Sequence, residues 1–252
     1  MTKLRLKSKD EIKKIKASAN LLALTLLEVE RNIVPGISTK ELDLIAYDFI
    51  IKNRAKPAFK GYRGFKGTIC ASVNEEVIHG IPGKRKLAVG DIVSIDCGVI
   101  LDGFYSDMAK TFKVGNVDPG IDKLLEVTNA SLYKGIAEMK VGNRILDISK
   151  AIEGYIKPFG FGIVREYTGH GVGFQLHEEP SVPNYYAPFF KNIRIQEGMV
   201  LAIEPMVNLK GHEVSIKSDG WTVFASDLSC SAHFEHTVAV VDGLPLILSE
   251  VK

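Results

Sequence analysis

The sequence contains an internal repeat, in which the second half resembles the first, and this repeat constrains the fold more than any other feature. Shifted by 106 residues, Gly36 falls on Gly142, and the apolar positions of the helix expected after each glycine coincide. Shifted by 108 residues, the β-rich run that ends in Asp96 falls on the run that ends in Glu204. A duplication of this kind suggests two related halves with pseudo-twofold symmetry and a shared site on the axis.

Two further correspondences extend the repeat to histidines and to a second pair of carboxylates. An offset of 98 places His79 on His177, and an offset of 128 places Asp107 on Glu235. The rise of the offset from 108 to 128 implies an insertion of about 20 residues in the second half, between residues 208 and 230.

Helix signals precede the strands in each half. Capping boxes, each a serine followed three residues later by glutamate, open predicted helices at Ser8 and Ser38, the first running to about residue 32. In the second half, Asp118-Pro119 opens a helix to about residue 140, and another follows Gly142.

Long helices followed by antiparallel strands predict an α+β fold, in which helices cover a curved antiparallel sheet. Because no Pro/Ser-rich linker divides the halves, we expect residues 1–252 to form a single domain with halves at about 1–115 and 116–252.

Asp96 and Asp107 flank Asp102-Gly103, a strong hairpin signal. If Asp102 and Gly103 are the central pair of the turn, Gly98 lies opposite Asp107; if Leu101 and Asp102 are central, Asp96 faces Asp107 directly. Side chains alternate along strands, so either register puts both carboxylates on one face. They are either solvent-facing acids on an open sheet or, because like charges so close are destabilising, acids with a cation between them.

Glu204 and Glu235 also lie in apolar, β-rich runs, where an acid is costly unless it is paired or bound to metal. His170 has glycines on both sides, which lets the backbone come close to a ligand. Four carboxylates and one imidazole suit Mn, Fe, Co or Zn without identifying one. Two bridging carboxylates would hold two divalent ions roughly 3.5–4 Å apart, as in hydrolytic two-metal sites.

Seven segments carry a family resemblance: Asp96, Asp107, Gly169-His170-Gly171, Ile203-Glu204-Pro205-Met206, Glu235-His236-Thr237, Asn74-Glu75 before His79-Gly80-Ile81-Pro82, and His177-Glu178-Glu179-Pro180. Together they resemble the type I methionine aminopeptidases, and the likeness covers essentially the whole chain. It implies the pita-bread fold and a centre of two divalent metal ions. It also implies removal of the initiator methionine from nascent proteins whose second residue is small, by attack of a metal-activated hydroxide on the first peptide bond.

The resemblance also implies the part each metal ligand plays. Asp96 would bind one metal, and His170 and Glu204 the other. Asp107 and Glu235 would bridge both ions.

Catalytic and substrate-binding roles follow from the same resemblance. Glu204 would act as general base and acid, His177 would stabilise the developing oxyanion, and His79 would orient the substrate backbone. With these two histidines, the methionine pocket would be lined by Phe59, Tyr62, Phe65, Cys70, Leu176 and Trp221.

The chain departs from the common family pattern at three positions. Phe59 stands where a cysteine is frequent, Leu176 where an aromatic residue is usual, and His233 where a glutamine is usual. His233 is two residues from Glu235, so on a strand it points to the same side. It would hydrogen-bond groups behind the metal ligands, contact substrate, or offer a nitrogen to metal, and these alternatives remain open.

The net charge of +2 gives no general attraction to DNA or to an anionic membrane. The first sixteen residues are nevertheless rich in lysine and arginine, and they predict either a solvated helix start or a contact with an acidic partner such as ribosomal RNA. The basic residues are Lys3, Arg5, Lys7, Lys9, Lys13, Lys14 and Lys16.

Three cysteines without a CxxC pair (Cys70, Cys97 and Cys230) favour a reducing compartment. The N-terminus lacks an apolar signal core, and the apolar stretch at 17–27 is too short to span a bilayer. We therefore expect a cytoplasmic protein. The resemblance implies that it meets the N-termini of nascent polypeptides, and we expect a monomer.

Three alternatives are less favoured. Prolidases usually carry an additional N-terminal domain, for which a first helix near Ser8 leaves no room. A type II methionine aminopeptidase would carry a long helical insertion, which the second half does not show. A non-catalytic relative of the same fold would have lost metal ligands, whereas all five are present.

Overall fold

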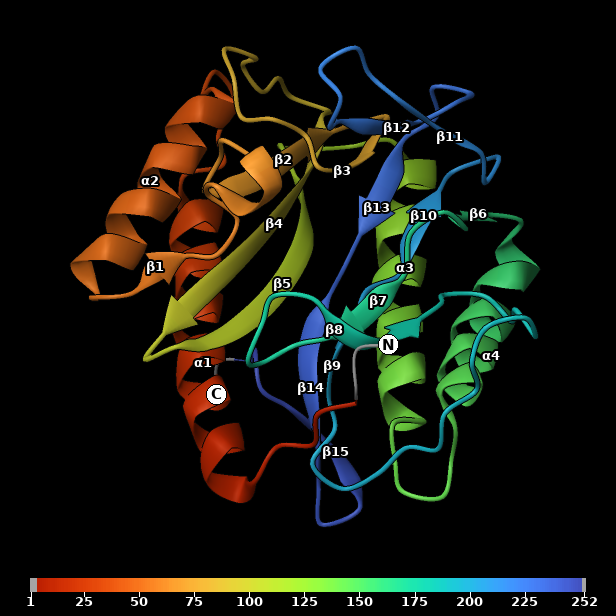
Figure 1. Ribbon diagram of the computed structural model, residues 1–252. Coiled ribbons are helices and arrows are strands. Elements are labelled where there is room, and N and C mark those ends of the chain that lie inside the picture. Colours follow the sequence, from red (N-terminus) through yellow and green to blue (C-terminus); the bar gives the residue numbers. More distant parts are fainter. Residues whose placement is uncertain (1–3, 251–252) are drawn as a thin grey trace.

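The computed structural model describes residues 4–250, so Lys3 of the basic N-terminal segment lies outside the described residues. Two helices lie on one side of the molecule and two on the other, with the strands between them (Figure 1). The helices are α1 (Lys9–Arg31), α2 (Thr39–Lys52), α3 (Pro119–Ala137) and α4 (Ile145–Ile156). The order of two helices followed by strands therefore occurs twice, as the repeat predicts.

The helix starts expected from the sequence are confirmed. In both capping boxes the serine side chain accepts from the glutamate amide, and the glutamate side chain accepts from the serine amide. At α3, the side chain of Asp118 accepts a hydrogen bond from the amide of Gly120. The helix α3 ends at Ala137, slightly earlier than expected, and the chain then bends so that Met139 is fully buried.

The first half forms a sheet around β4, which pairs with β5 along one edge and with β2 and β1 along the other. The bounds are β1 (Lys56–Pro57), β2 (Ile69–Val73), β4 (Ile92–Leu101) and β5 (Phe104–Lys113). The second half forms a sheet in the order β15-β14-β9-β7-β8. Its strands are β7 (Gly169–Gly171), β8 (Glu178–Val182), β9 (Val200–Ile203), β14 (His236–Val241) and β15 (Leu244–Ile247).

Two small sheets complete the strand layer, in the orders β13-β10-β6 and β11-β12-β3. The bounds of their strands are β3 (Glu76–Ile78), β6 (Gly162–Ile163), β10 (Met206–Asn208), β11 (Val214–Ile216), β12 (Val223–Ala225) and β13 (Ser231–His233). All of the strand pairs between named strands are antiparallel.

The pairing of β2 with β4 in the first half corresponds to the pairing of β7 with β9 in the second half. Ser72 of β2 pairs with Ser94 of β4, and His170 of β7 pairs with Ala202 of β9. These pairs are related by the offsets of 98 and 108 found in the sequence. The strand pairs β2–β4 and β7–β9 therefore share one register, and His170 occupies the position of a serine in the first half.

The hairpin β11–β12 is the insertion expected between residues 208 and 230, because it lies between β10 and β13. Its second strand pairs with β3 of the first half, with Val223 opposite Ile78. The insertion thus crosses to the other half of the molecule and places Trp221 against Phe65.

Each helix pair packs on the sheet of its own half, and the first turns of α1 also pack on the second sheet, where Ile15 shares a core with Val200. Leu22 of α1 and Leu42 of α2 share an apolar core with Ile95 of β4, whereas Leu124 of α3 and Ile148 of α4 belong to a second core. All five side chains have 0% exposure, and full burial of such a side chain stabilises the fold by about 1.5–3 kcal/mol. These apolar cores hold the helices against the strands that carry the acids.

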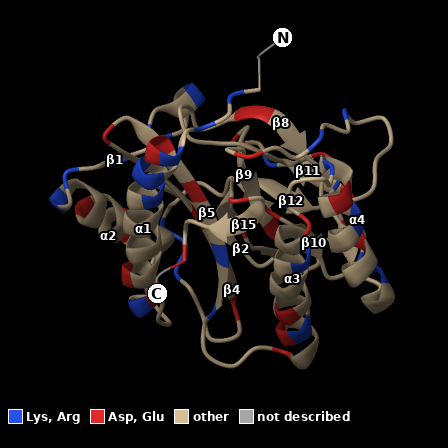
Figure 2. Ribbon diagram, turned by 90° about the horizontal axis from the view of Figure 1, so that it is seen from below, with Lys and Arg blue, Asp and Glu red and all other residues tan. Residues whose placement is uncertain are grey.

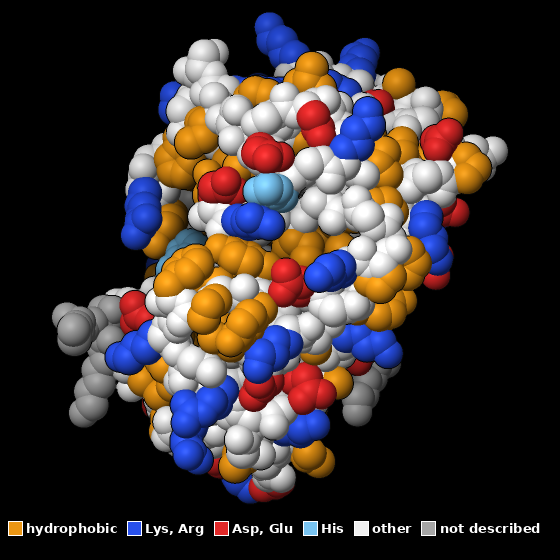
Figure 3. All heavy atoms as spheres, turned by 90° about the vertical axis from the view of Figure 1, so that its right-hand side faces the viewer, with side chains coloured by type: hydrophobic (Ala, Val, Ile, Leu, Met, Phe, Trp, Pro, Cys, Tyr) orange, Lys and Arg blue, Asp and Glu red, His pale blue; other side chains and the backbone are white. Residues whose placement is uncertain are grey.

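Charged positions of both signs are interspersed along the helices (Figure 2). On the side of α4, lysines, arginines and acids likewise surround a group of hydrophobic side chains (Figure 3). Among residues 4–250, no helix combines the length and apolar character needed to cross a membrane.

Candidate metal centre and substrate pocket

The hairpin β4–β5 fixes the positions of the first two acids. Asp102 and Gly103 are the central residues of its turn, so Gly98 lies opposite Asp107, which is the first of the two registers considered. Asp96 is two residues from Gly98 and therefore projects from the same face as Asp107. Asp107 is only 3% exposed, which excludes the alternative of a solvent-facing acid.

The second pair of acids lies at the ends of strands in the other half. Glu204 directly follows β9, and Glu235 directly precedes β14. The amide of Glu235 donates to the carbonyl of Ala109 on β5 at 2.8 Å, and the hydroxyl of Thr237 donates to the carbonyl of Asp107 at 2.7 Å. These bonds hold β5 and β14 side by side, so each half delivers acids to one point.

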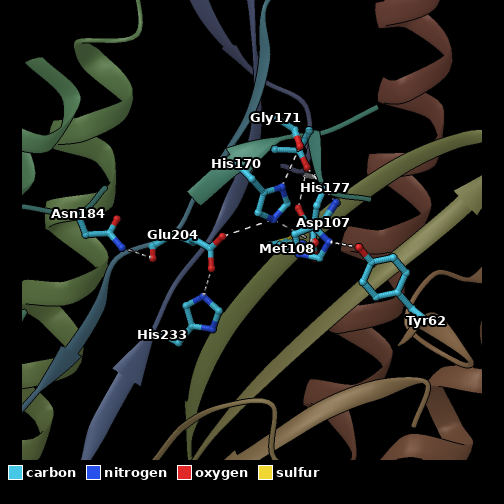
Figure 4. Close-up of polar contacts among 10 residues, drawn as sticks. Tyr62, Asp107, Met108, His170, Gly171, His177, Asn184, Glu204 and His233 are labelled. Carbon is cyan, nitrogen blue, oxygen red and sulfur yellow. Dashed lines mark hydrogen bonds and ion pairs between the residues drawn. The ribbon is translucent and has the colours of Figure 1, made fainter. Parts of the chain in front are cut away.

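His170 reaches the same point from β7 (Figure 4). Its Nε2 atom lies 3.5 Å from Oε1 of Glu204 and 3.9 Å from Oδ2 of Asp107. Its Nδ1 atom is 2.9 Å from the carbonyl of Gly171, which can only accept, so the proton sits on Nδ1. Nε2 therefore presents its lone pair to the acids.

The glycines beside His170 serve a different purpose from the one expected. A Cβ atom at Gly169 would overlap the carbonyl of Ala202, and one at Gly171 would overlap the carbonyl of Glu179. Glycine is required here because the neighbouring strands come so close, and this packing, rather than an approach to a ligand, explains the pattern.

Several buried polar atoms around the acids lack a hydrogen-bond partner among the described residues. They include Oδ1 of Asp96, Oε1 of Glu235 and both ring nitrogens of His233. Buried polar atoms are normally paired, so a cluster of orphaned oxygen and nitrogen donors fits a bound cation.

Distances between potential ligand atoms support this fit. Two groups have all their ligand atoms within 4.8 Å of one another: Asp107 with His170 and Glu235, and Glu204 with His233 and Glu235. Glu235 belongs to both groups, as a bridging ligand would. Asp96 is in neither group, but it faces the same cavity.

Burial and mutual repulsion make these acids hard to ionise together. Burial raises the pKa of Asp96 to about 7 and that of Glu204 to about 7. Burial also raises the pKa values of Asp107 and Glu235 well above their usual range, and the nearby carboxylates raise them further. A divalent cation would relieve this cost by binding the ionised forms.

Metal-free protein is expected to lose stability as the pH rises from about 6.5 to 8.5. The raised carboxyls hold protons that the unfolded chain has released, so the free energy of unfolding falls by about 1.4 kcal/mol per pH unit for each retained proton. Below pH 6.5 the buried histidines, whose pKa values are lowered, act in the opposite direction. Thermal melts of chelated protein test this, and a midpoint that rises across the window would contradict it.

A cavity of about 350 Å³ adjoins the acids. The five expected metal ligands and all eight expected substrate-binding residues line it. The eight substrate-binding residues are Phe59, Tyr62, Phe65, Cys70, His79, Leu176, His177 and Trp221. The ring of Phe59 packs against Gly98, and a Cβ atom at position 98 would lie only 2.7 Å from that ring. Leu176 is 2% exposed and packs in the same apolar cluster.

The two cavity histidines are held by aromatic neighbours. Nδ1 of His177 is 3.0 Å from the hydroxyl of Tyr62, and the two rings are stacked. His79 meets Tyr167 and Trp221 edge-on. Burial lowers the pKa of His177 to about 3 and that of His79 to about 4, so both are neutral at pH 7.

Sequence reasoning missed five further residues of the cavity wall: Arg63, Ile78, Glu166, Tyr167 and Thr168. Three of them adjoin recognised motifs, because Ile78 precedes His79 and Tyr167-Thr168 precede Gly169. Position next to a motif is therefore a usable signal for these three. Arg63 adjoins the expected pocket residue Tyr62, whereas Glu166 adjoins no residue that the sequence singled out.

Comparisons with known proteins agree with this geometry. Residues 13–242 match Metallopeptidase family M24. The chain is 96% identical over 251 residues to the methionine aminopeptidase of Borreliella burgdorferi, with 100% of both chains covered. The crystal structure of methionine aminopeptidase from Thermotoga maritima has a TM-score of 0.95 and 42% identity, covering 99% of this chain and 100% of that one.

A more distant likeness shows the fold alone. Prolidase from Pyrococcus furiosus has a TM-score of 0.79 at 22% identity, and the match covers 98% of this chain and 66% of that chain.

Proposed function

Because the chain belongs to metallopeptidase family M24, within the methionine aminopeptidases, we propose that its acid cluster and adjoining cavity release the initiator methionine when the second residue is small. The chain is thus a metal-dependent hydrolase that removes N-terminal methionine from new proteins. The expected pita-bread α+β fold is confirmed by the likeness to both aminopeptidase and prolidase structures. One observation carries the proposal: the cluster of acids and an apolar pocket line the same cavity.

The family uses divalent metal, and we propose two ions in this chain. Asp96 would hold one, His170 and Glu204 the other, and Asp107 and Glu235 would bridge them. Bound ions of this kind lower the pKa of water to about 7 and polarise a scissile carbonyl. Mn, Fe, Co and Zn all suit the donor set.

Glu204 would act as the general base and general acid. Its carboxylate would accept a proton from the attacking water and return it to the departing amino group. Glu204 is 9% exposed and one of its oxygens faces His170, so its orientation is restricted before substrate binds. General acid–base catalysis of this kind typically contributes about 10²–10⁴-fold to the rate.

Charge on the scissile oxygen would be stabilised by His177. If the hydroxyl of Tyr62 donates to Nδ1, the neutral ring carries its proton on Nε2 and can donate it to that oxygen. His79 would orient the substrate backbone from the other side of the cavity. A donor placed before the reaction starts stabilises the transition state without reorganisation.

The chain would act as one catalytic domain, because neither half contains the full ligand set. The substrates are the N-termini of nascent proteins. The proposal includes a monomer, because one chain supplies all five proposed metal ligands together with the apolar pocket.

A ribosome contact through the basic N-terminal segment would use only part of that segment. Lys7 is 5% exposed and forms an ion pair of 2.7 Å with Glu178, so it is committed to the fold. Arg5 lies over the ring of Phe174. Exposed cations such as Lys13, which pairs with Asp10 only at the surface, are left to meet ribosomal RNA.

A peptide panel tests the proposed specificity. Metal-free protein, supplied in turn with Mn²⁺, Fe²⁺, Co²⁺ or Zn²⁺, should release methionine from Met-Ala peptides at least about tenfold faster than from Met-Leu peptides. Dipeptides Xaa-Pro with other first residues should not be cleaved. Full activity after exhaustive chelation, or equal cleavage across the panel, would contradict the proposal.

A further inference from the structure

His233 is a buried histidine whose side chain has no assigned role in the site. It ends β13 and is 1% exposed, and neither ring nitrogen has a hydrogen-bond partner among the described residues. Its backbone is fixed, because the hydroxyl of Thr111 accepts from its amide and donates to its carbonyl, both at 2.9 Å. A ring buried in this way without a partner is costly, so a ligand for it is expected.

The ring faces the acid cluster. Its Nε2 atom is 3.3 Å from Oε2 of Glu204, while the other oxygen of Glu204 faces Nε2 of His170 at 3.5 Å. One carboxylate therefore lies between two imidazoles that come from different strands (Figure 4). Ligand atoms of Glu204, His233 and Glu235 lie within 4.8 Å of one another.

We propose that His233 is a sixth protein ligand, which binds through Nε2 the ion that Glu204 and Glu235 also hold. The inference rests on the proposed metal centre and extends it. A second imidazole makes the donor set richer in nitrogen, and nitrogen donors suit Fe, Co and Zn better than the all-oxygen sets that Mn prefers. It follows that this chain should discriminate against Mn²⁺ more strongly than a variant with glutamine at this position.

Proton NMR of the Co²⁺-loaded protein tests the proposal directly. Each imidazole bound to Co²⁺ gives a strongly shifted, exchangeable ring N–H signal. The wild type should show two such signals, one from His170 and one from His233. His233→Gln should remove one signal and weaken Co²⁺ binding to the metal-free protein by about tenfold or more.

His212→Gln is the matched control, because His212 belongs to neither group of potential metal ligands and its Nδ1 atom instead faces Oε1 of Glu213 at 3.7 Å, so both signals and the Co²⁺ affinity should be unchanged. A single shifted N–H signal in the wild type overturns the proposal, and this reading does not depend on whether His233→Gln folds. Unchanged Co²⁺ affinity and an unchanged signal count in folded His233→Gln overturn it as well. Failure of the wild type to bind Co²⁺ at all would instead refute the proposed metal centre.

Discussion

Replacing Glu204 by Gln is expected to lower kcat/KM for methionine release by about 10⁴-fold, the upper end of the range for a lost general acid–base group. The change removes the proton acceptor and the anionic oxygens that lie between His170 and His233. It also removes one of four mutually repelling acids. The metal-free variant should therefore be more stable than metal-free wild type at pH 8, even though it is inactive.

Opposite changes in activity and stability distinguish this role from simple structural damage. Initial rates on a Met-Ala peptide and thermal melts of chelated protein measure the two quantities. Glu213→Gln is a suitable control, because the Glu213 side chain is 67% exposed and outside the cavity wall. If Glu204→Gln kept activity within tenfold of wild type, the general base would have to be another residue.

Replacing His177 by Ala is expected to lower kcat by about 10²–10³-fold with little change in KM, as for a lost oxyanion donor. The ring is the cavity donor held in place by Tyr62. Tyr62→Phe deletes only the hydroxyl and keeps the stacked ring, so its loss should be smaller and in the same direction. Steady-state kinetics of both variants provides the comparison.

An effect of His177→Ala confined to KM would mean that the histidine binds substrate without stabilising the transition state. Equal losses in the two variants would mean that the hydroxyl of Tyr62, rather than the imidazole, is the donor. Metal content of each variant should match wild type, because neither residue is among the proposed ligands.

Local signals predicted local structure well. Capping boxes placed the starts of α1 and α2, and Asp102-Gly103 placed the turn that puts Asp96 and Asp107 on one face. The acids were recognisable because a charged side chain in an apolar, buried run is costly unless it is paired or bound to metal. The repeat predicted two related halves, each with two helices followed by strands.

Contacts between the halves could not be predicted in the same way. The bond from the amide of Glu235 to the carbonyl of Ala109 joins residues far apart in sequence, and no local pattern encodes it. The pairing of β12 with β3 is of the same kind. The glycines beside His170 were misinterpreted for a related reason, since the strands that crowd them come from elsewhere in the chain.

The contact between β5 and β14 would couple the folding of the chain to the binding of the proposed metal ions. Each half carries only part of the proposed ligand set, so neither half alone would bind the ions as tightly as the two halves packed together. By mass action, metal at about 100 times its Kd would stabilise the docked state by about 2.7 kcal/mol. The ions would therefore stabilise the packing of the two halves as well as take part in the reaction. In a cell short of metal, the two halves would separate more readily and would be more susceptible to proteolysis.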